Sequence, residues 1–256
     1  MKTKFMGALI LLSGMALLYT SCKKDAAKQN TTQNQSTAAS PDVISQQVAA
    51  NLAKSLAGTY GGVNLSNGLS APSVIQSDFG HQGGSTPNPL CGFTVDTVLH
   101  YTTNVGDTIK STSNGRIIFY FNCFNGQPAG FLASDSLKTV GTAPGYSFLF
   151  DITQYYVIKS LNSANSLLLV NGALKSFVDL TYSKTGIKPT TDHTTYVMLG
   201  LTVDLSKNND VTSGIATFIS TGSNNYGPWT YVGTIKYLGN HKADVTINGK
   251  VYHITF

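Results

Sequence analysis

YVMLGLTVDL, residues 196–205, is the stretch that decides the fold class of this chain. Every second residue in it is aliphatic: Val197, Leu199, Leu201, Val203 and Leu205. Successive side chains of a β-strand point to opposite faces of a sheet, so the stretch predicts a strand with one wholly aliphatic face. We therefore expect that face to lie against a hydrophobic core.

The same period of two continues over most of residues 91–256, for example at 146–152, where Tyr, Phe, Phe and Ile alternate with other residues. Residues 116–123 (RIIFYFNC) are apolar on both faces and predict a central strand that is covered on both sides. The pairs Asn171-Gly172 and Asn248-Gly249 predict two-residue hairpin turns. The predicted fold class is mostly β: an antiparallel meander of about ten strands, closed as a barrel or half-barrel or folded as a sandwich.

The last three predicted strands allow their register to be derived. A turn at Asn248-Gly249 sets Asp244 opposite His253, and a three-residue turn at 239–241 sets Lys236 opposite Asp244. This register lines up three ionisable side chains on one face: Lys236, Asp244 and His253. The opposite, core-facing side then carries Ile235, Val245 and Tyr252.

One amphipathic helix is predicted ahead of the strands, over residues 41–57. Ser40 takes the N-cap position, Pro41 the first helical position, and Gly58 provides the stop. Apolar residues recur within it at a spacing of four: Ile44, Val48, Leu52 and Leu56. We expect this stripe to pack on the sheet, so that residues 41–256 form a single domain.

The N-terminus has the parts of a cleaved signal peptide. Lys2 and Lys4 give it a positive start, residues 5–18 form an apolar run, and a short segment leads to Cys22. The run is shorter than the roughly 20 apolar residues that a membrane-spanning helix needs. Residues 1–21 are therefore expected to be removed.

This leader resembles that of bacterial envelope lipoproteins, whose signal peptidase cuts before a cysteine preceded by small residues. The resemblance implies that Cys22 becomes the N-terminus and carries acyl chains such as palmitate, which anchor the protein in a membrane. Tyr19 departs from the family, which usually has an aliphatic residue there. Lys23 replaces the Asp that commonly retains lipoproteins at the inner membrane, which implies the outer membrane, on its periplasmic or cell-surface face. The alternative is an ordinary secretory peptide cut near Ser21.

Residues 22–40 contain no large apolar side chain. Such a segment cannot bury enough apolar surface to offset the entropy of ordering. We expect it to form a flexible tether between the lipid and the domain.

The composition favours strands and excludes nucleic-acid binding. Charged residues make up 11% of the chain, Glu is absent and Arg116 is the only Arg, whereas helical proteins use both freely. Most of the net charge of +5 arises near the N-terminus, from Lys2, Lys4, Lys23, Lys24 and Lys28 with Asp25, and the chain from Pro41 onward carries +1. The rest of the chain is nearly balanced and offers no basic surface to a nucleic acid.

Cys91 and Cys123 form a natural pair in an oxidising compartment once Cys22 is acylated. A bridge between them is predicted to stabilise the fold by roughly 3 to 4 kcal/mol through chain entropy. The alternative is a pair of buried free thiols.

No motif of an enzyme, metal site or cofactor site is found in the sequence. The G-x-S-x-G and H-E-x-x-H patterns are absent, and the five histidines are scattered. Residues 204–210 have the alternating oxygen side chains of a calcium loop but lack its Gly and its final acid, which favours a polar hairpin turn. We therefore expect a non-catalytic protein without metal or cofactor.

Aromatic residues give the sequence its best binding hypothesis. Tyr226, Trp229 and Tyr231 surround the turn at 224–228, where exposed rings beside Asn side chains would suit a glycan. The alternative is that Trp229 and Tyr231 face the core. Residues 61–89 predict a long Gly-rich loop, and Phe79, His81 and Phe93, in or near it, could rim a ligand site.

These features together predict a lipid-anchored outer-membrane protein with a binding or scaffold role, whose partners are the membrane and a glycan or an envelope protein. One alternative is a carrier that holds a lipid or another hydrophobic ligand in an apolar cavity formed by a curled sheet. A second alternative is a hydrolase in which Asp244 orients His253 as a general base.

Overall fold

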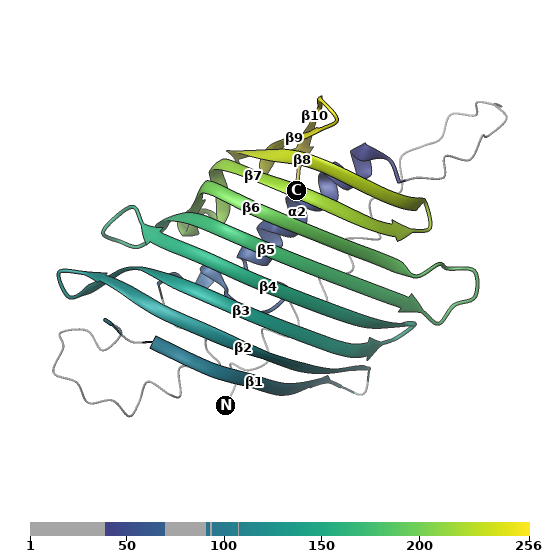
Figure 1. Cartoon of the computed structure of the whole chain (residues 1–256), viewed down its shortest axis with the longest axis horizontal. Coiled ribbons are helices and arrows are strands. Elements are labelled where there is room, and N and C mark those ends of the chain that lie inside the picture. The colour runs from purple at the N-terminus through teal and green to yellow at the C-terminus, as the bar shows by residue number, and fades with distance from the viewer. Residues whose placement is uncertain (1–38, 70–90, 93, 107) are drawn as a thin grey trace.

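The computed structural model describes residues 39–69, 91–92, 94–106 and 108–256. These residues form one helix of several turns and a ten-stranded antiparallel sheet in which each strand pairs with the next along the chain (Figure 1). The elements are α2 (Pro41–Leu56), β1 (Thr94–Val105), β2 (Ile109–Phe124), β3 (Gln127–Ala143), β4 (Tyr146–Ser160), β5 (Leu167–Tyr182), β6 (Thr190–Asp204), β7 (Asp210–Asn224), β8 (Gly227–Gly239), β9 (Lys242–Ile247) and β10 (Lys250–Thr255). The predicted antiparallel meander is confirmed.

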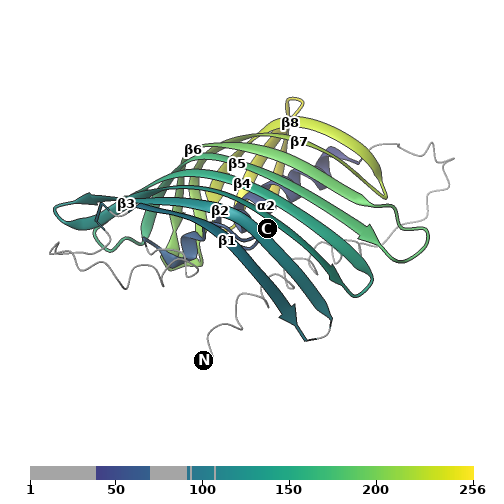
Figure 2. The same ribbon diagram turned by 60° about the horizontal axis from the view of Figure 1, so that its bottom comes forward.

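The sheet is open and curved. β1 and β10 are its two edges and do not pair with each other, so the sheet is not closed as a barrel. Figure 2 shows it curved around α2, which lies on the concave side. This half-barrel is one of the forms that the sequence predicts. Within the described ranges, no helix is both long and apolar enough to cross a membrane.

Helix α2 begins and ends where the sequence predicts, to within one residue. Ser40 is the N-cap, Pro41 opens the helix, and Gly58 follows it with φ of 74°, a conformation that glycine adopts without strain. The predicted stripe is buried, with exposed fractions of 2% or less, at Ile44, Val48, Leu52 and Leu56. The helix therefore lies with its apolar stripe in the core of the domain.

Two sheet tyrosines fix α2 to the concave face by hydrogen bonds. The Tyr196 hydroxyl of β6 donates to the carbonyl oxygen of Val48 at 3.1 Å, and the Tyr237 hydroxyl of β8 donates to that of Ala49 at 3.0 Å. Both tyrosine side chains are fully buried, so each hydroxyl needs a partner inside the protein. The pair of bonds sets the position of the helix over β6 and β8.

The concave side of the sheet is aromatic as well as aliphatic. The predicted face of β4 is confirmed, because Phe148, Phe150 and Ile152 are all buried. Between β2 and β3, the ring of Phe119 stacks on that of Phe131 at 4.5 Å and meets that of Phe121 edge-on at 4.8 Å. These rings extend the core to the β1–β3 side of the sheet.

The aliphatic face predicted for residues 196–205 is wrong, because a β-bulge divides β6. Two residues, Leu199 and Gly200, oppose Asn171 of β5, and the Asn171 side-chain oxygen accepts the Gly200 N–H at 2.8 Å. Gly200 has φ of 63°. An extra residue reverses the alternation of faces. As a result Val197 and Leu199 are 44% and 58% exposed, whereas Leu201 and Val203 are buried.

The turn predicted at Asn171-Gly172 is also wrong, because both residues lie inside β5 opposite that bulge. The turn at Asn248-Gly249 is confirmed: both residues have positive φ, 52° and 78°, as a two-residue hairpin turn of this kind requires. The dipeptide Asn-Gly thus occurs in this protein both inside a strand and in a hairpin turn.

The predicted register of β8, β9 and β10 is confirmed. Asp244 pairs with His253 and with Lys236, and Ile235 pairs with Val245. The predicted three-residue turn is wrong. Only Asn240 and His241 form the turn, and a register shift between Tyr237 and Gly239 supplies the additional residue.

The expectation that residues 116–123 form a central strand covered on both sides is wrong. β2 lies next to the edge strand, and only its concave face is covered: Ile117, Phe119 and Phe121 are buried, but Tyr120 on the other face is 40% exposed. The sheet has one covered face, so this strand needs apolar residues on one side only.

Several predictions concern residues outside those that the structure describes. They are the signal peptide 1–21, nearly all of the tether 22–40 with Cys22, most of the loop 61–89, and the rim residues Phe79, His81 and Phe93.

Candidate functional site

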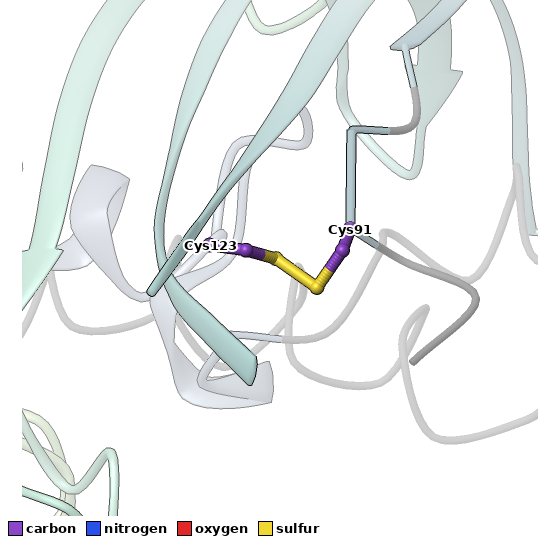
Figure 3. Close-up of a disulfide and its surroundings, with 2 residues drawn as sticks. All are labelled: Cys91 and Cys123. Carbon is purple, nitrogen blue, oxygen red and sulfur yellow. A yellow bond between two sulfur atoms is a disulfide. The ribbon is translucent and has the colours of Figure 1, made fainter. Parts of the chain in front are cut away.

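The predicted disulfide joins Cys91 to Cys123 (Figure 3). Its Cα atoms lie 5.5 Å apart, within the range that a disulfide spans. The bond ties the segment before β1 to the end of β2, and the alternative of two free thiols is wrong. Both residues therefore have a structural role in this fold.

The three aromatic residues proposed for glycan binding are not brought together on one surface. Trp229 is 4% exposed, and its indole N–H donates to the Ser220 hydroxyl at 3.0 Å. The Tyr231 hydroxyl donates to the Ala39 carbonyl oxygen at 2.8 Å, on the concave side. Only Tyr226, in the β7–β8 turn, is largely exposed, at 58%. The rings of Trp229 and Tyr231 thus serve the core.

The row of Lys236, Asp244 and His253 lies on the exposed face, as the register predicts. The His253 Nδ1 is 2.7 Å from an Asp244 carboxylate oxygen, and 82% of the His253 side chain is exposed. A contact with such exposure contributes little to stability and is screened by solvent. Its geometry is that of a surface pair between neighbouring strands.

A groove crosses the exposed face of the sheet from β4 to β7 and is the candidate binding site. Its volume is about 330 Å³, at the lower end of the range for small-molecule sites. Four residues that lie opposite one another on neighbouring strands form one row of the groove: Asp151, Phe177, His193 and Thr221. The adjacent row consists of Thr153, Lys175, Thr195 and Ile219.

The depth of the groove follows from the sizes of these side chains. In the second row the short threonines Thr153 and Thr195 alternate with the longer Lys175 and Ile219, and in the first row the short Thr221 follows Phe177 and His193. The ring of Phe177 and the imidazole of His193 meet edge to face with centroids 4.0 Å apart. The two rings hold each other in one orientation.

The charged groups of the groove remain open to a ligand. Asp151, Lys175 and His193 take part in none of the ion pairs of the described part of the chain. Together with the Thr hydroxyls they offer both donors and acceptors beside an aromatic ring. No three His, Cys or Asp side chains converge on a metal-sized site within the ranges that the structure describes. The groove is therefore suited to bind a polar ring-shaped molecule.

Sequence reasoning missed this groove because of the turn expected at Asn171-Gly172. That turn would end one strand at residue 170 and place it between β4 and the strand that carries Phe177, so Phe177 would not lie beside Asp151. An unbroken β5 pairs Phe177 with both Asp151 and His193. The signal in the sequence that could have found it is the alternation of Lys175, Phe177 and Asp179 with the apolar Leu174, Val178 and Leu180.

Two buried carboxylates lie on the other side of the sheet, near α2. Burial raises the pKa of Asp135 to about 7 and also raises the pKa of Asp192. Asp192 accepts hydrogen bonds from Thr194 at 2.7 Å and from Gln47 of α2 at 2.5 Å. These acids lie in the core, so their role is in holding the helix and its following segment on the sheet.

The comparisons with known proteins give no relative: no protein family, no curated protein and no solved structure matches this chain.

Proposed function

We propose that the mature protein is a lipid-anchored, non-catalytic binding protein of the outer membrane, and that it binds a glycan in the groove on β4–β7. The observation that carries this proposal is the groove itself. It combines an oriented aromatic ring with Asp151, Lys175 and three Thr hydroxyls. Sugars present an apolar ring face and a rim of hydroxyl groups, which match a ring and a mixed set of donors and acceptors.

The anchor in this proposal is Cys22, and the tether is the segment that follows it. The chain enters the domain at Ala39, whose N–H donates to the Pro228 carbonyl oxygen at 3.3 Å next to the β7–β8 turn. The entry point therefore lies at one end of the sheet, whereas the groove lies on its exposed face. A flexible tether attached there would leave that face open to a ligand.

The filled concave side favours a binding role over the carrier alternative. A carrier would present apolar side chains of the curled sheet to its ligand. Here α2 and the concave-face residues of β6–β10 bury one another, including Met198, Ile235 and Val245 at 1% exposure or less. The hydrolase alternative rests on Asp244 and His253 alone, and this pair lies at the open surface.

The test is glycan binding by the mature chain from residue 22, with Cys22→Ser to keep it in solution. We expect hits on a glycan array, followed by titration calorimetry of the best hit. Phe177→Ala should weaken its affinity by tenfold or more, or about 1.4 kcal/mol, because the stacking surface is removed. Tyr120→Ala, an exposed aromatic on β2 outside the groove, is the matched control and should bind like the parent.

The proposal is rejected if no glycan binds, or if Phe177→Ala binds as tightly as the parent. Circular dichroism of both variants guards against a folding defect, since Phe177 is half-buried.

A further inference from the structure

β1 is a long edge strand. It pairs with β2 in an unbroken register from Thr94↔Tyr120 to Val105↔Ile109, and no strand of the described residues pairs with its other side (Figure 1). An edge of this kind presents a row of backbone N–H and C=O groups that can pair with another strand.

This edge lacks the features that normally prevent pairing. β1 is 12 residues long, contains no Pro and no Lys, and its register with β2 has no bulge. The opposite edge, β10, has only 6 residues, and Lys250 opens it. Proteins usually protect edges with short strands, prolines, lysines or bulges. Of the two edges that the described residues form, β1 is therefore the one better suited to pair with another strand.

The side chains of β1 are self-complementary about Val98. Val98 is 76% exposed, and Asp96 and His100 lie two residues to either side of it on the same exposed face. If β1 pairs with an antiparallel copy of itself about a two-fold axis at Val98, Asp96 of each chain lies opposite His100 of the other. An axis at Thr97 or Leu99 leaves both charged residues opposite other side chains.

We propose that the protein forms a symmetric dimer in which β1 pairs with β1 of a second copy, with Val98 opposite Val98 and Asp96 opposite His100. On the concave face the same register places Val95 opposite Tyr101 and Thr97 opposite Leu99, which continues the apolar side of the sheet. The result is one continuous antiparallel sheet with an isologous interface.

Neighbouring residues hold the charged pair in place. Arg116 on β2 forms a bidentate ion pair with Asp96, with N···O distances of 2.7 and 2.6 Å, and its hydrogen bond lowers the pKa of that carboxyl, which stays charged. His100 Nδ1 is 2.5 Å from the Asn114 side-chain oxygen. This contact leaves Nε2 as the ring nitrogen that can face Asp96 of the other copy.

The dimer would leave the groove accessible, because β1 lies three strands away from β4. A two-fold axis perpendicular to the sheet keeps both exposed faces on one side. Each dimer would then present two grooves to a polymeric ligand, a consequence that rests on the proposed function. The interface itself does not depend on it.

Sedimentation equilibrium of the mature chain carrying Cys22→Ser tests the dimer. The parent should form dimers reversibly as its concentration rises. Val98→Lys places two like charges opposite each other at the axis and should weaken the dimer by tenfold or more. Val232→Lys, 59% exposed on β8, is the matched control and should dimerise like the parent. A parent that stays monomeric at every concentration overturns the proposal, as does a dimer that Val98→Lys leaves unchanged.

Cysteine cross-linking tests the register. Directly opposite residues of paired strands are close enough for a disulfide, and Cys91 and Cys123 are already bonded to each other. Val98→Cys should form a covalent dimer under mild oxidation. Thr94→Cys should do so only when mixed with Thr102→Cys, because those positions lie opposite in this register. Efficient cross-linking of Thr94→Cys by itself, or none of Val98→Cys, overturns the assigned pairing.

Discussion

Phe121→Ala is expected to lower the free energy of unfolding by about 3 to 5 kcal/mol. Phe121 is 0% exposed on the concave face of β2, and its ring lies edge-on to those of Phe119 and Phe131, with centroids 4.8 and 6.3 Å away. Its removal leaves a cavity lined by rings that are fixed by the strands on either side. The loss therefore includes both the transfer of the ring from water and the unfilled space.

The measurement is denaturant unfolding followed by tryptophan fluorescence. Trp229 is the single tryptophan and is buried in the same core, so its emission reports on global unfolding. Phe124→Ala, three residues further along β2, is the matched control because Phe124 is 73% exposed. It should change stability by less than about 0.5 kcal/mol. Equal losses for the two variants would contradict the burial of Phe121.

The sequence predicts the local structure well wherever one signal acts alone. The C-terminal register follows from Asn248-Gly249, because an Asn-Gly turn fixes the pairing of the strands on either side. Helix α2 follows from its caps and its stripe of four apolar residues. In both cases the deciding interactions lie within a few residues along the chain.

The prediction fails at β5 and β6, where two signals compete. Asn171-Gly172 has the sequence of a turn, but its Asn side chain instead bonds to Gly200 of the neighbouring strand. The bulge at that point allows Tyr196 and Met198 as well as Leu201 and Val203 to face the core. Burial of these side chains outweighs the regular alternation of Val197 to Leu205. A strict period of two cannot show where a bulge intervenes.

The groove could not be predicted for the same reason. The eight residues of its two rows come from four strands, and none of them belongs to a sequence motif. Phe177 and His193 reach 4.0 Å because β5 pairs with β6 in one register, and Asp151 joins them because the unbroken β5 also pairs with β4. The position of a site on the face of a sheet depends on every register within it, whereas a motif-based site depends on one segment.

The buried carboxylate of Asp135 is the source of the second large effect. Asp135 is 3% exposed on β3, and one of its oxygens accepts the Val63 N–H at 2.9 Å. Gln154 on β4 accepts the same N–H at 2.8 Å, and its amide donates to Ser55 of α2 at 3.2 Å. The second Asp135 oxygen has no hydrogen-bond partner. Burial therefore opposes ionisation and raises the pKa from 3.8 to about 7.

Because the pKa of Asp135 is raised in the folded state, its ionisation lowers the stability of the protein as the pH rises. The folded state holds the proton of Asp135 more tightly than the unfolded chain does, so this residue favours folding most below pH 4. The contribution is lost progressively as the pH rises from about 4 to about 7, and it is absent above that range. Its full size is about 4 kcal/mol, because each pKa unit corresponds to roughly 1.36 kcal/mol. Asp192 acts in the same direction, since its pKa is also raised.

Asp135→Asn is therefore expected to be more stable than the parent at pH 8, by about 2 kcal/mol, and to lose that advantage at pH 4. The amide keeps an acceptor for the Val63 N–H and cannot ionise, but its unpartnered N–H₂ group offsets part of the gain. Denaturant unfolding at a series of pH values, followed through Trp229, measures the difference. Asp192→Asn, at a second buried acid near α2, is the comparison variant: its side chain accepts hydrogen bonds from Gln47 and Thr194, so it also shows the cost of altering such bonds. If Asp135→Asn and the parent lose stability in parallel between pH 5 and pH 8, Asp135 is ionised throughout that range and the assigned direction of its pKa is wrong.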